Sequence, residues 1–378
     1  MNKTKEKKSI LSNMSIQGKH QILRMTVSIL IGLGLATALI VFSSDLPRTS
    51  LKLFFTAPLT NASYFTFWIQ KAIPLMFTGT AVSIMFSANK FNLGLEGAFL
   101  FGGMVGGALT NIYLFPGQRV LGSIMGCIIG GVVGAIITLI PALLERIFNA
   151  SVMVTSLMMN YICLWFSTYL LYSKFKDPRT SGSTYSWTNT YQEYMTYKIK
   201  IGSDKLTIFY SLFIAIVVVI LAWLFLYRSK LGFKLRQVGK NQKFAQYVGI
   251  SVSSVAILSQ VIGGFIGGLG GACEIMSLYT NYRWVELTGL GWDGVTMAVF
   301  AKNNPKYVPL AALFISYLRA GAYVMSVKTG IQNDMTKIVE ATIILFLLAE
   351  KFLSKTYRRM IIAEAEKERK STNELEVN

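Results

Sequence analysis

Two short stretches of the sequence place an acid between glycines, at the edges of long apolar runs. The first reads LGLEG at 93–97 and contains Glu96, and the second reads LGWDG at 290–294 and contains Asp293. A glycine before the acid lets the backbone break, so that the acid falls in the first turn of a new helix, where the helix dipole favours negative charge. In a membrane, such an acid would either hold a helix start in place or bind a proton or cation.

Few other ionisable residues lie within the apolar runs. Those that stand out are Glu274, Arg319 and Glu340. Ionisable residues inside a bilayer are costly and usually face a cavity or a partner. For Arg319 and Glu340, a salt bridge or an interface position is an equal alternative.

The sequence does not indicate catalytic chemistry. His20 is the one histidine, and the sequence has no nucleophile–base pair, ATP-binding loop or metal-binding spacing. We therefore expect no enzyme activity, no cofactor and no metal site. The three cysteines, Cys127, Cys163 and Cys273, fall inside apolar runs, and we expect them to be buried apolar side chains.

The composition is that of a membrane protein. Hydrophobic residues make up 53% of the 378 residues and charged residues 15%, whereas a soluble protein carries roughly 25% charged residues. Several apolar runs are long enough to cross a hydrocarbon core of about 30 Å as helices. We predict an all-α, polytopic membrane protein with ten transmembrane helices, at 25–42, 72–88, 94–114, 120–140, 153–172, 206–227, 253–277, 288–301, 308–326 and 336–352.

The net charge of +19 is distributed as the positive-inside rule expects, and not as a nucleic-acid site would be. Residues 43–71 are predicted to lie outside, as an interfacial or re-entrant helix. The other predicted segments are a basic cytoplasmic N-terminus (1–24), a transmembrane domain (25–352) containing an extracytoplasmic loop (173–205) and a basic cytoplasmic loop (228–251), and a cytoplasmic tail (353–378).

In this topology the two glycine-bracketed acids open spans of opposite direction. LGLEG starts a span that runs outward, and LGWDG starts one that runs inward. This arrangement predicts an inverted repeat with broken helices near the midplane, as in many transporters; two ordinary helix starts are the alternative. Glycines at small-xxx-small spacing predict close helix packing, at 102/106, 126/130/134 and 263/267/271.

The loop 228–251 is the most basic cytoplasmic segment. Its helical pattern places Phe244, Tyr247 and Val248 on one apolar face. A basic loop of this kind could bind anionic lipid. The apolar stripe favours docking on a protein instead.

Five stretches, in this order, carry a resemblance to a known family: FNLGLEGAFLFGG (91–103), TSLMMNY (155–161), LGFKLRQVGKNQKFAQYVGIS (231–251), GGFIGGLGGACEIM (263–276) and GLGWDGVTMAVFAKNNP (289–305). The chain resembles the permeases of bacterial ABC importers for branched-chain amino acids, ribose-type sugars and nucleosides, and is most similar to the nucleoside branch. The resemblance implies a multi-pass protein of the bacterial plasma membrane with both termini cytoplasmic. It also implies three partners besides membrane lipid: an ABC ATPase subunit, a second permease subunit, and an extracytoplasmic solute-binding lipoprotein.

The stretch GKNQKFAQYVG (239–249) resembles the family's coupling segment, which docks on the ATPase. Ala245 and Gly249 occupy positions where the family usually has Ala and Gly, whereas Phe244 replaces a frequent Ala. The resemblance implies that these residues contact the ATPase: Gly239, Lys240, Asn241, Phe244, Ala245, Tyr247 and Gly249.

The resemblance also implies a translocation path, which we expect to be lined by Asn92, Glu96, Asn160, Glu274, Trp292 and Asp293. The amides and tryptophans, with Trp284, are of suitable type for ribose hydroxyls and a nucleobase. A simple sugar or a riboflavin-like vitamin is an alternative solute. A stand-alone carrier using Glu96 and Asp293 as ion sites is a further alternative, against which the coupling-like loop argues.

Overall fold

The computed structural model describes residues 16–179, 182–183, 195–201 and 204–330, and positions 337, 338, 341, 342 and 345. The tail at 353–378 therefore lies outside the described residues, as do most of the N-terminal segment 1–24 and part of the loop 173–205. The last predicted span, 336–352, is described at five helical positions alone.

By its contacts the chain divides into two units, residues 1–52 with 325–378, and residues 53–324. In the first unit, α2 (Ile16–Ser43) contains the apolar stretch Leu30–Phe42, which coincides with the first predicted span. α3 (Pro47–Thr60) begins in this unit and ends in the second. The predicted outside segment 43–71 is therefore helical over much of its length, because α4 already begins at Ala62.

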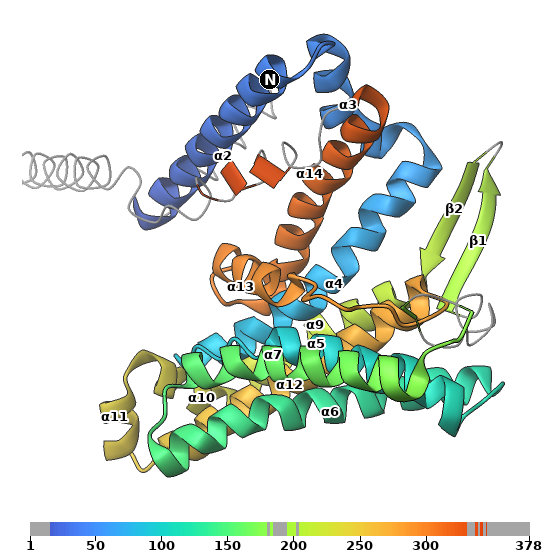
Figure 1. Ribbon diagram of the computed structural model, residues 1–378. Helices are drawn as coiled ribbons and strands as arrows, with labels where there is room; N and C mark the ends of the chain where they lie inside the picture. Colours follow the sequence, from blue (N-terminus) through green and yellow to red (C-terminus); the bar gives the residue numbers. More distant parts are fainter. Residues whose placement is uncertain are drawn as a thin grey trace, which may run out of the picture. The chain divides into compact units, whose positions relative to one another are not determined.

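The second unit is a bundle of long apolar helices, drawn in Figure 1. Together with α2 and α14, these helices show that the protein is polytopic and all-α in its spans. Seven helices among the described residues are long and apolar enough to cross a membrane, and they match seven of the ten predicted spans. They are α4 (Ala62–Ser87), α5 (Leu95–Gly102) continued by η1 (Gly103–Leu114), α6 (Arg119–Phe148), α7 (Val152–Leu170) continued by η2 (Leu171–Phe175), α9 (Tyr210–Arg228), α12 (Val252–Leu278), and η3 (Pro305–Tyr307) continued by α14 (Val308–Thr329).

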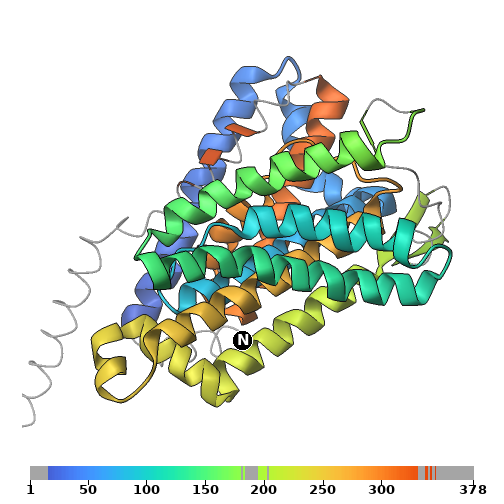
Figure 2. The same ribbon diagram turned by 60° about the horizontal axis from the view of Figure 1, so that its bottom comes forward.

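Glycines set the closest packing in the bundle, between α12, α6 and α5. A Cβ added at Gly134 would collide with the Gly264 carbonyl oxygen, and one added at Gly268 would collide with the Gly130 carbonyl oxygen. A Cβ at Gly102 would meet the backbone of Gly268. The glycine spacing thus works as predicted, because bare backbones let these helices touch. Figure 2 shows α5, α6 and α7 side by side along the bundle.

One predicted span is wrong as a complete crossing. Residues 288–301 form α13 (Leu290–Phe300), a helix of 11 residues. Such a helix is about 16 Å long, against about 30 Å for a hydrocarbon core. The 11 residues before it, 279–289, form neither helix nor strand.

The predicted loop 173–205 contains a feature that the sequence analysis missed. β1 (Thr196–Ile201) and β2 (Asp204–Phe209) pair as an antiparallel hairpin, with Thr196 opposite Phe209. The alternating pattern TYKIKI is the signal that could have predicted it. The hairpin lies at the opposite end of the bundle from α10 (Lys230–Lys240) and α11 (Gln242–Tyr247), as Figures 1 and 2 both show.

Candidate translocation site

The helical structure is interrupted between α4 and α5. Helix α4 ends at Ser87, Asn89 adopts a left-handed conformation with φ 55°, and residues 90–93 form neither helix nor strand. Backbone groups at such a break lack helical partners, and inside a membrane protein they must find others.

Side chains supply those partners. The Asn160 carboxamide oxygen accepts a hydrogen bond from the Gly97 N–H at 2.8 Å, and its NH₂ group donates to the Leu93 carbonyl at 2.9 Å. The Ser156 hydroxyl accepts from the Leu93 N–H at 3.0 Å. Helix α7 therefore holds the start of α5 through two side chains one turn apart.

Asn92 fixes the break from within. Its Oδ1 accepts from the Gly94 N–H at 2.8 Å, and its Nδ2 donates to the Gln260 Oε1 at 2.6 Å and to the Thr138 carbonyl at 3.2 Å. The Thr138 hydroxyl in turn donates to the Gln260 carbonyl at 2.9 Å. Asn92 is fully buried, and these three bonds use both of its amide hydrogens.

The α5 start lies deep in the bundle. A Cβ at Gly267, near the middle of α12, would collide with the Leu95 side chain. Leu95 is the first residue of α5, and Glu96 follows it. The helix that LGLEG opens therefore begins well inside the bundle, as predicted for a broken span.

A second break precedes α13. Residues 279–289 follow the end of α12 and form neither helix nor strand. Tyr282 in this segment is nevertheless fully buried, and its hydroxyl shares a 2.9 Å hydrogen bond with the Ser167 hydroxyl. Trp284 stacks on Phe99 of α5, with ring centroids 5.8 Å apart. The segment thus packs against α5 and α7, and it ends at Gly289, whose φ of 76° favours glycine.

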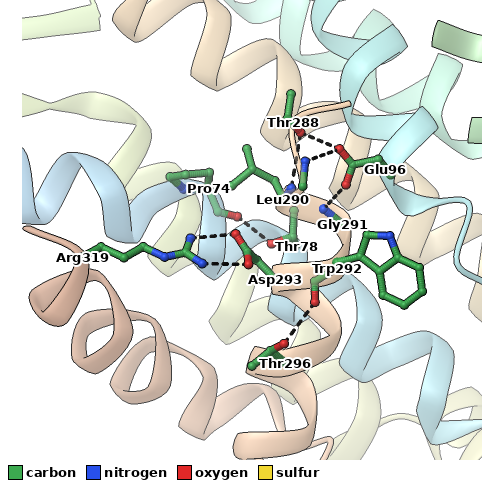
Figure 3. A network of polar contacts seen from close by, with 11 residues as sticks. Pro74, Thr78, Glu96, Thr288, Leu290, Gly291, Trp292, Asp293, Thr296 and Arg319 are labelled. Carbon is green, nitrogen blue, oxygen red and sulfur yellow. Dashed lines mark hydrogen bonds and ion pairs between the residues drawn. The ribbon is translucent and has the colours of Figure 1, made fainter. Parts of the chain in front are cut away.

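Glu96 connects the two non-helical segments, because it lies at the start of α5 and binds the start of α13. Its Oε1 accepts from the Thr288 hydroxyl at 2.8 Å and from the Gly289 N–H at 2.7 Å, and its Oε2 accepts from the Gly291 N–H at 2.6 Å. Figure 3 shows the carboxylate facing the first turn of α13. Glu96 is 1% exposed. It therefore caps a helix that begins almost two hundred residues later in the chain, where the helix dipole favours its charge.

Asp293 points to the other side of α13, as Figure 3 shows. Its two carboxylate oxygens accept hydrogen bonds from the Arg319 guanidinium at 2.7 and 2.8 Å. We expected each acid to be held by the first turn of its own helix. That expectation is wrong for both, because Glu96 binds α13 and Asp293 binds an arginine of α14.

Helix α13 rests on the middle of α4. A Cβ at Gly294 would lie 2.7 Å from the Thr78 Cβ, and a Cβ at Gly79 would lie 2.7 Å from the Met297 Cβ. One at Gly291 would lie 2.7 Å from the backbone nitrogen of Glu96. Both interrupted helices thus start inside the bundle and touch at Glu96. The structure does not bear on the inverted repeat itself, which stays a prediction.

The six residues predicted to line the path fall into two groups. Asn92, Asn160 and Glu96 use their hydrogen bonds to hold the starts of α5 and α13 in place. Trp292 is half-exposed on α13, and Figure 3 shows its ring on the opposite side of the helix from the partly exposed Asp293–Arg319 pair. Glu274 is buried on α12, and one of its carboxylate oxygens has no hydrogen-bond partner.

Sequence reasoning missed four residues that complete this network. They are polar residues within apolar runs, which is the one signal that could have identified them: Thr138, Ser156, Gln260 and Thr288. Among the described residues, no three His, Cys, Asp or Glu side chains cluster as a metal site requires. Of the cysteines, Cys163 and Cys273 are buried and Cys127 is partly exposed.

The predicted coupling segment forms α10 and α11 with caps that its sequence provides. The Ser229 hydroxyl accepts from the Gly232 N–H at 2.9 Å, and the Asn241 Oδ1 accepts from the Phe244 N–H at 3.1 Å. α11 ends at Tyr247, Gly249 follows with a left-handed φ of 80°, and the Ile250 N–H donates to the Ala245 carbonyl.

Three apolar side chains are exposed on α11 and its C-cap, beside the exposed Lys243 and Gln246. Phe244 and Val248 are more than half exposed, and Tyr247 is 91% exposed, whereas Ala245 is buried. At the end of α10, a Cβ added at Gly239 would collide with the Ser87 carbonyl oxygen. The segment therefore rests directly on the end of α4, where the first break begins.

Comparison of the sequence with known proteins identifies the family of the chain. The family model described as "Branched-chain amino acid transport system / permease component" matches residues 64–348. The guanosine ABC transporter permease protein NupP of Bacillus subtilis is 29% identical over 74% of this chain and 79% of its own length. The nucleoside ABC transporter permease protein NupB of Lactococcus lactis is 28% identical over 75% of this chain and 79% of its own.

A third relative is named for a different solute. A glucose ABC transporter permease protein of Haloferax volcanii is 26% identical over 85% of each chain. No solved structure matches the chain.

Proposed function

Since the chain belongs to the family of branched-chain amino acid transport system permease components and is an ABC transporter permease subunit, we propose that it forms the membrane path of a nucleoside importer. The observation that carries the proposal is the meeting of two interrupted spans at Glu96, deep in the bundle. Broken helices at such depth line the solute path in many transporters. The two nucleoside permease relatives name the solute class.

The first exposed turns of α13 are the surface that we assign to the solute. Trp292 offers a flat apolar face for a base, whereas Asp293 and Arg319 offer an acceptor and a donor on the other side of α13. Glu274, with one oxygen unpartnered, is the other polar group that could receive a ribose hydroxyl. Asn92 and Asn160 support the path without contacting solute, because their bonds hold the backbone.

The power for transport comes, in this proposal, from a separate ATPase subunit that docks on α11. The exposed Phe244, Tyr247 and Val248 supply an apolar contact, and the basic residues around them favour an acidic partner surface. Ala245 is buried beneath these side chains, so its part is to let α11 lie close to the bundle. A second permease subunit and an extracytoplasmic solute-binding lipoprotein complete the importer.

Orientation follows from the same proposal. α10 and α11 lie at one end of the bundle and the β1–β2 hairpin at the other. If the ATPase binds α11, that end of the bundle is cytoplasmic and the hairpin is extracytoplasmic.

Uptake of labelled guanosine tests the solute. The chain and its partner subunits are expressed in a host that lacks other nucleoside transporters, with unlabelled guanosine, ribose, glucose or riboflavin as competitor. We expect competition by guanosine alone. Trp292→Ala should weaken uptake while Trp292→Phe retains it. The matched control is Trp165→Ala, since Trp165 is an exposed tryptophan of α7.

A sugar importer is the second candidate, and the glucose permease relative favours it. Absence of guanosine uptake, with uptake of labelled glucose or ribose by the same complex, would replace the nucleoside assignment. Membership of the ABC permease family argues against the ion-coupled carrier. The buried hydrogen bonds of Glu96 also argue against it, because both of its carboxylate oxygens already accept hydrogen bonds from Thr288, Gly289 and Gly291 of the chain itself.

A further inference from the structure

Two cysteine sulfurs from different helices lie in contact. The Sγ of Cys127 in α6 and the Sγ of Cys273 in α12 are 3.4 Å apart, and both residues are free thiols. The third cysteine, Cys163, lies in a separate cluster with Ala98 and Ile137. The chain therefore has one pair of neighbouring thiols, from residues 146 positions apart, and one thiol outside that pair.

The close packing of α6 and α12 brings these sulfurs within reach of a covalent bond. A Cβ added at Gly130 of α6 would lie 2.8 Å from the Cβ of Ala272, the neighbour of Cys273. Further along the same two helices, the Thr138 hydroxyl donates to the Gln260 carbonyl at 2.9 Å. A disulfide has an S–S bond of about 2.05 Å and needs Cα atoms no more than about 7 Å apart. Helices that touch beside the cysteines meet this need, so that rotation of the two side chains can close the gap between the sulfurs.

The two thiols differ in access. Cys127 is partly exposed and lines an apolar groove of about 690 Å³, whereas Cys273 is fully buried. The oxidation of a cysteine depends on its exposure. A small uncharged oxidant can therefore reach the Cys127 sulfur from the groove, and the Cys273 sulfur is in contact with the sulfur that it reaches.

We propose that Cys127 and Cys273 form a site of reversible oxidation by hydrogen peroxide, in which Cys127 reacts first and Cys273 resolves it. The Cys127 sulfur, having lost its proton, attacks one peroxide oxygen. The O–O bond breaks, and a sulfenic acid and one water form. The Cys273 sulfur then attacks the Cys127 sulfur, so that an S–S bond forms, the S–O bond breaks, and the hydroxide leaves as water with the Cys273 proton. In sum the two thiols lose two electrons and two protons, and one peroxide becomes two waters.

The pair keeps oxidation at a stage that a reductant can reverse. A sulfenic acid that meets no thiol is oxidised further to sulfinic and sulfonic acids, which dithiothreitol does not reduce. A thiol 3.4 Å away intercepts the sulfenic acid before that step. The resulting disulfide also joins α6 covalently to α12.

Peptide mass spectrometry of the purified full-length chain, together with the subunits that accompany it, tests the site. The complex is treated with hydrogen peroxide in detergent, the remaining thiols are blocked with N-ethylmaleimide, and the chain is digested without reductant. We expect the peptides that contain Cys127 and Cys273 to be joined, and dithiothreitol to separate them. Cys163 should stay outside the cross-link.

Serine variants separate the roles of the two thiols. Cys273→Ser should lose the cross-link completely, and Cys127 should instead carry sulfinic acid after the same treatment. Cys127→Ser should leave Cys273 as a free thiol, because the exposed member of the pair is gone. Cys163→Ser is the matched control and should keep the cross-link. Sulfinic acid at Cys127 of the wild type without a joined peptide, or two unreacted thiols at the pair, would overturn the proposal.

Discussion

The Glu96 Oε2 lies 2.6 Å from the backbone nitrogen of Gly291, a residue 195 positions further along the chain. This bond ties the first turn of α5 to the first turn of α13, and the Gly289 N–H and Thr288 hydroxyl reinforce it. Removing one partner of a buried hydrogen bond leaves the other unsatisfied, at a cost of about 1–3 kcal/mol. Glu96 is thus the residue whose loss should most directly loosen α13.

Glu96→Gln should slow uptake without abolishing it. A glutamine keeps one acceptor oxygen, so either Gly291 or the Thr288–Gly289 pair loses its bond. Glu96→Ala should be worse, because all three donors lose their acceptor, and stability should fall by about 1–3 kcal/mol. Uptake rates and thermal unfolding in detergent measure both effects. Glu145→Gln is the control, since its partly exposed pair with Lys90 should contribute at most about 1 kcal/mol. Similar unfolding temperatures for Glu96→Ala and Glu145→Gln would contradict this role.

Gly291→Ala should displace the start of α13. The added Cβ would lie 2.7 Å from both the Glu96 nitrogen and its Oε2, closer than such atoms approach. We expect uptake to fall and Trp292 fluorescence to shift in a background where the other tryptophans are Phe. Gly34→Ala is the control, because a Cβ there meets open space. Full uptake with an unshifted Trp292 spectrum in Gly291→Ala would show that the contact between residue 291 and Glu96 tolerates a Cβ.

Asp293 and Arg319 should contribute to the stability of the protein as a coupled pair, and not as two independent residues. Asp293→Asn leaves Arg319 without its bidentate carboxylate, and Arg319→Gln leaves a half-buried acid. Each single variant should reduce stability, and the double variant should recover part of the loss, because neither charge is then left alone. Thermal unfolding of all four proteins measures the coupling. Losses that simply add in the double variant would mean that the two groups act independently.

Gly239→Ala should uncouple ATP hydrolysis from transport. The added methyl collides with the Ser87 carbonyl, at the end of α4 and next to the first break. It leaves the exposed face of α11 unchanged, so the ATPase should still co-purify while solute transported per ATP falls. Tyr247→Ala is the comparison variant and should instead reduce co-purification, because Tyr247 is 91% exposed. These assignments would be reversed if Gly239→Ala lost co-purification of the ATPase while the complexes that still formed transported the normal amount of solute per ATP.

Single cysteines should report opposite sides of the membrane at the two ends of the bundle. In a background lacking the three native cysteines, Lys198→Cys on the hairpin should react with an impermeant thiol reagent in intact cells. Lys240→Cys at the end of α10 should react only after the cells are opened. Labelling of Lys240→Cys in intact cells would show that the orientation is inverted.

The class of the protein and most of its spans follow from local features of the sequence. Apolar runs such as Val252–Leu278 and Tyr210–Arg228 are long enough that a bilayer permits them one form, a helix, since every backbone group must be bonded within the segment. The caps of α11 are also local, because Asn241 and Gly249 act on residues a few positions away, but we did not predict them from the sequence. Each of these signals is local.

The tertiary structure alone decided how the two glycine-bracketed acids work. Their patterns correctly marked helix starts inside the bundle, but the bonds of each acid go to residues distant in sequence. Glu96 is bound by Thr288, Gly289 and Gly291, and Asp293 by Arg319. The prediction that residues 288–301 cross the bilayer was likewise wrong, since an apolar run looks the same whether it crosses a bilayer as helix or enters the bundle partly as extended chain. A short motif specifies a helix start through local backbone geometry, whereas the partner that fills its hydrogen bonds is set by which helices the packing brings together.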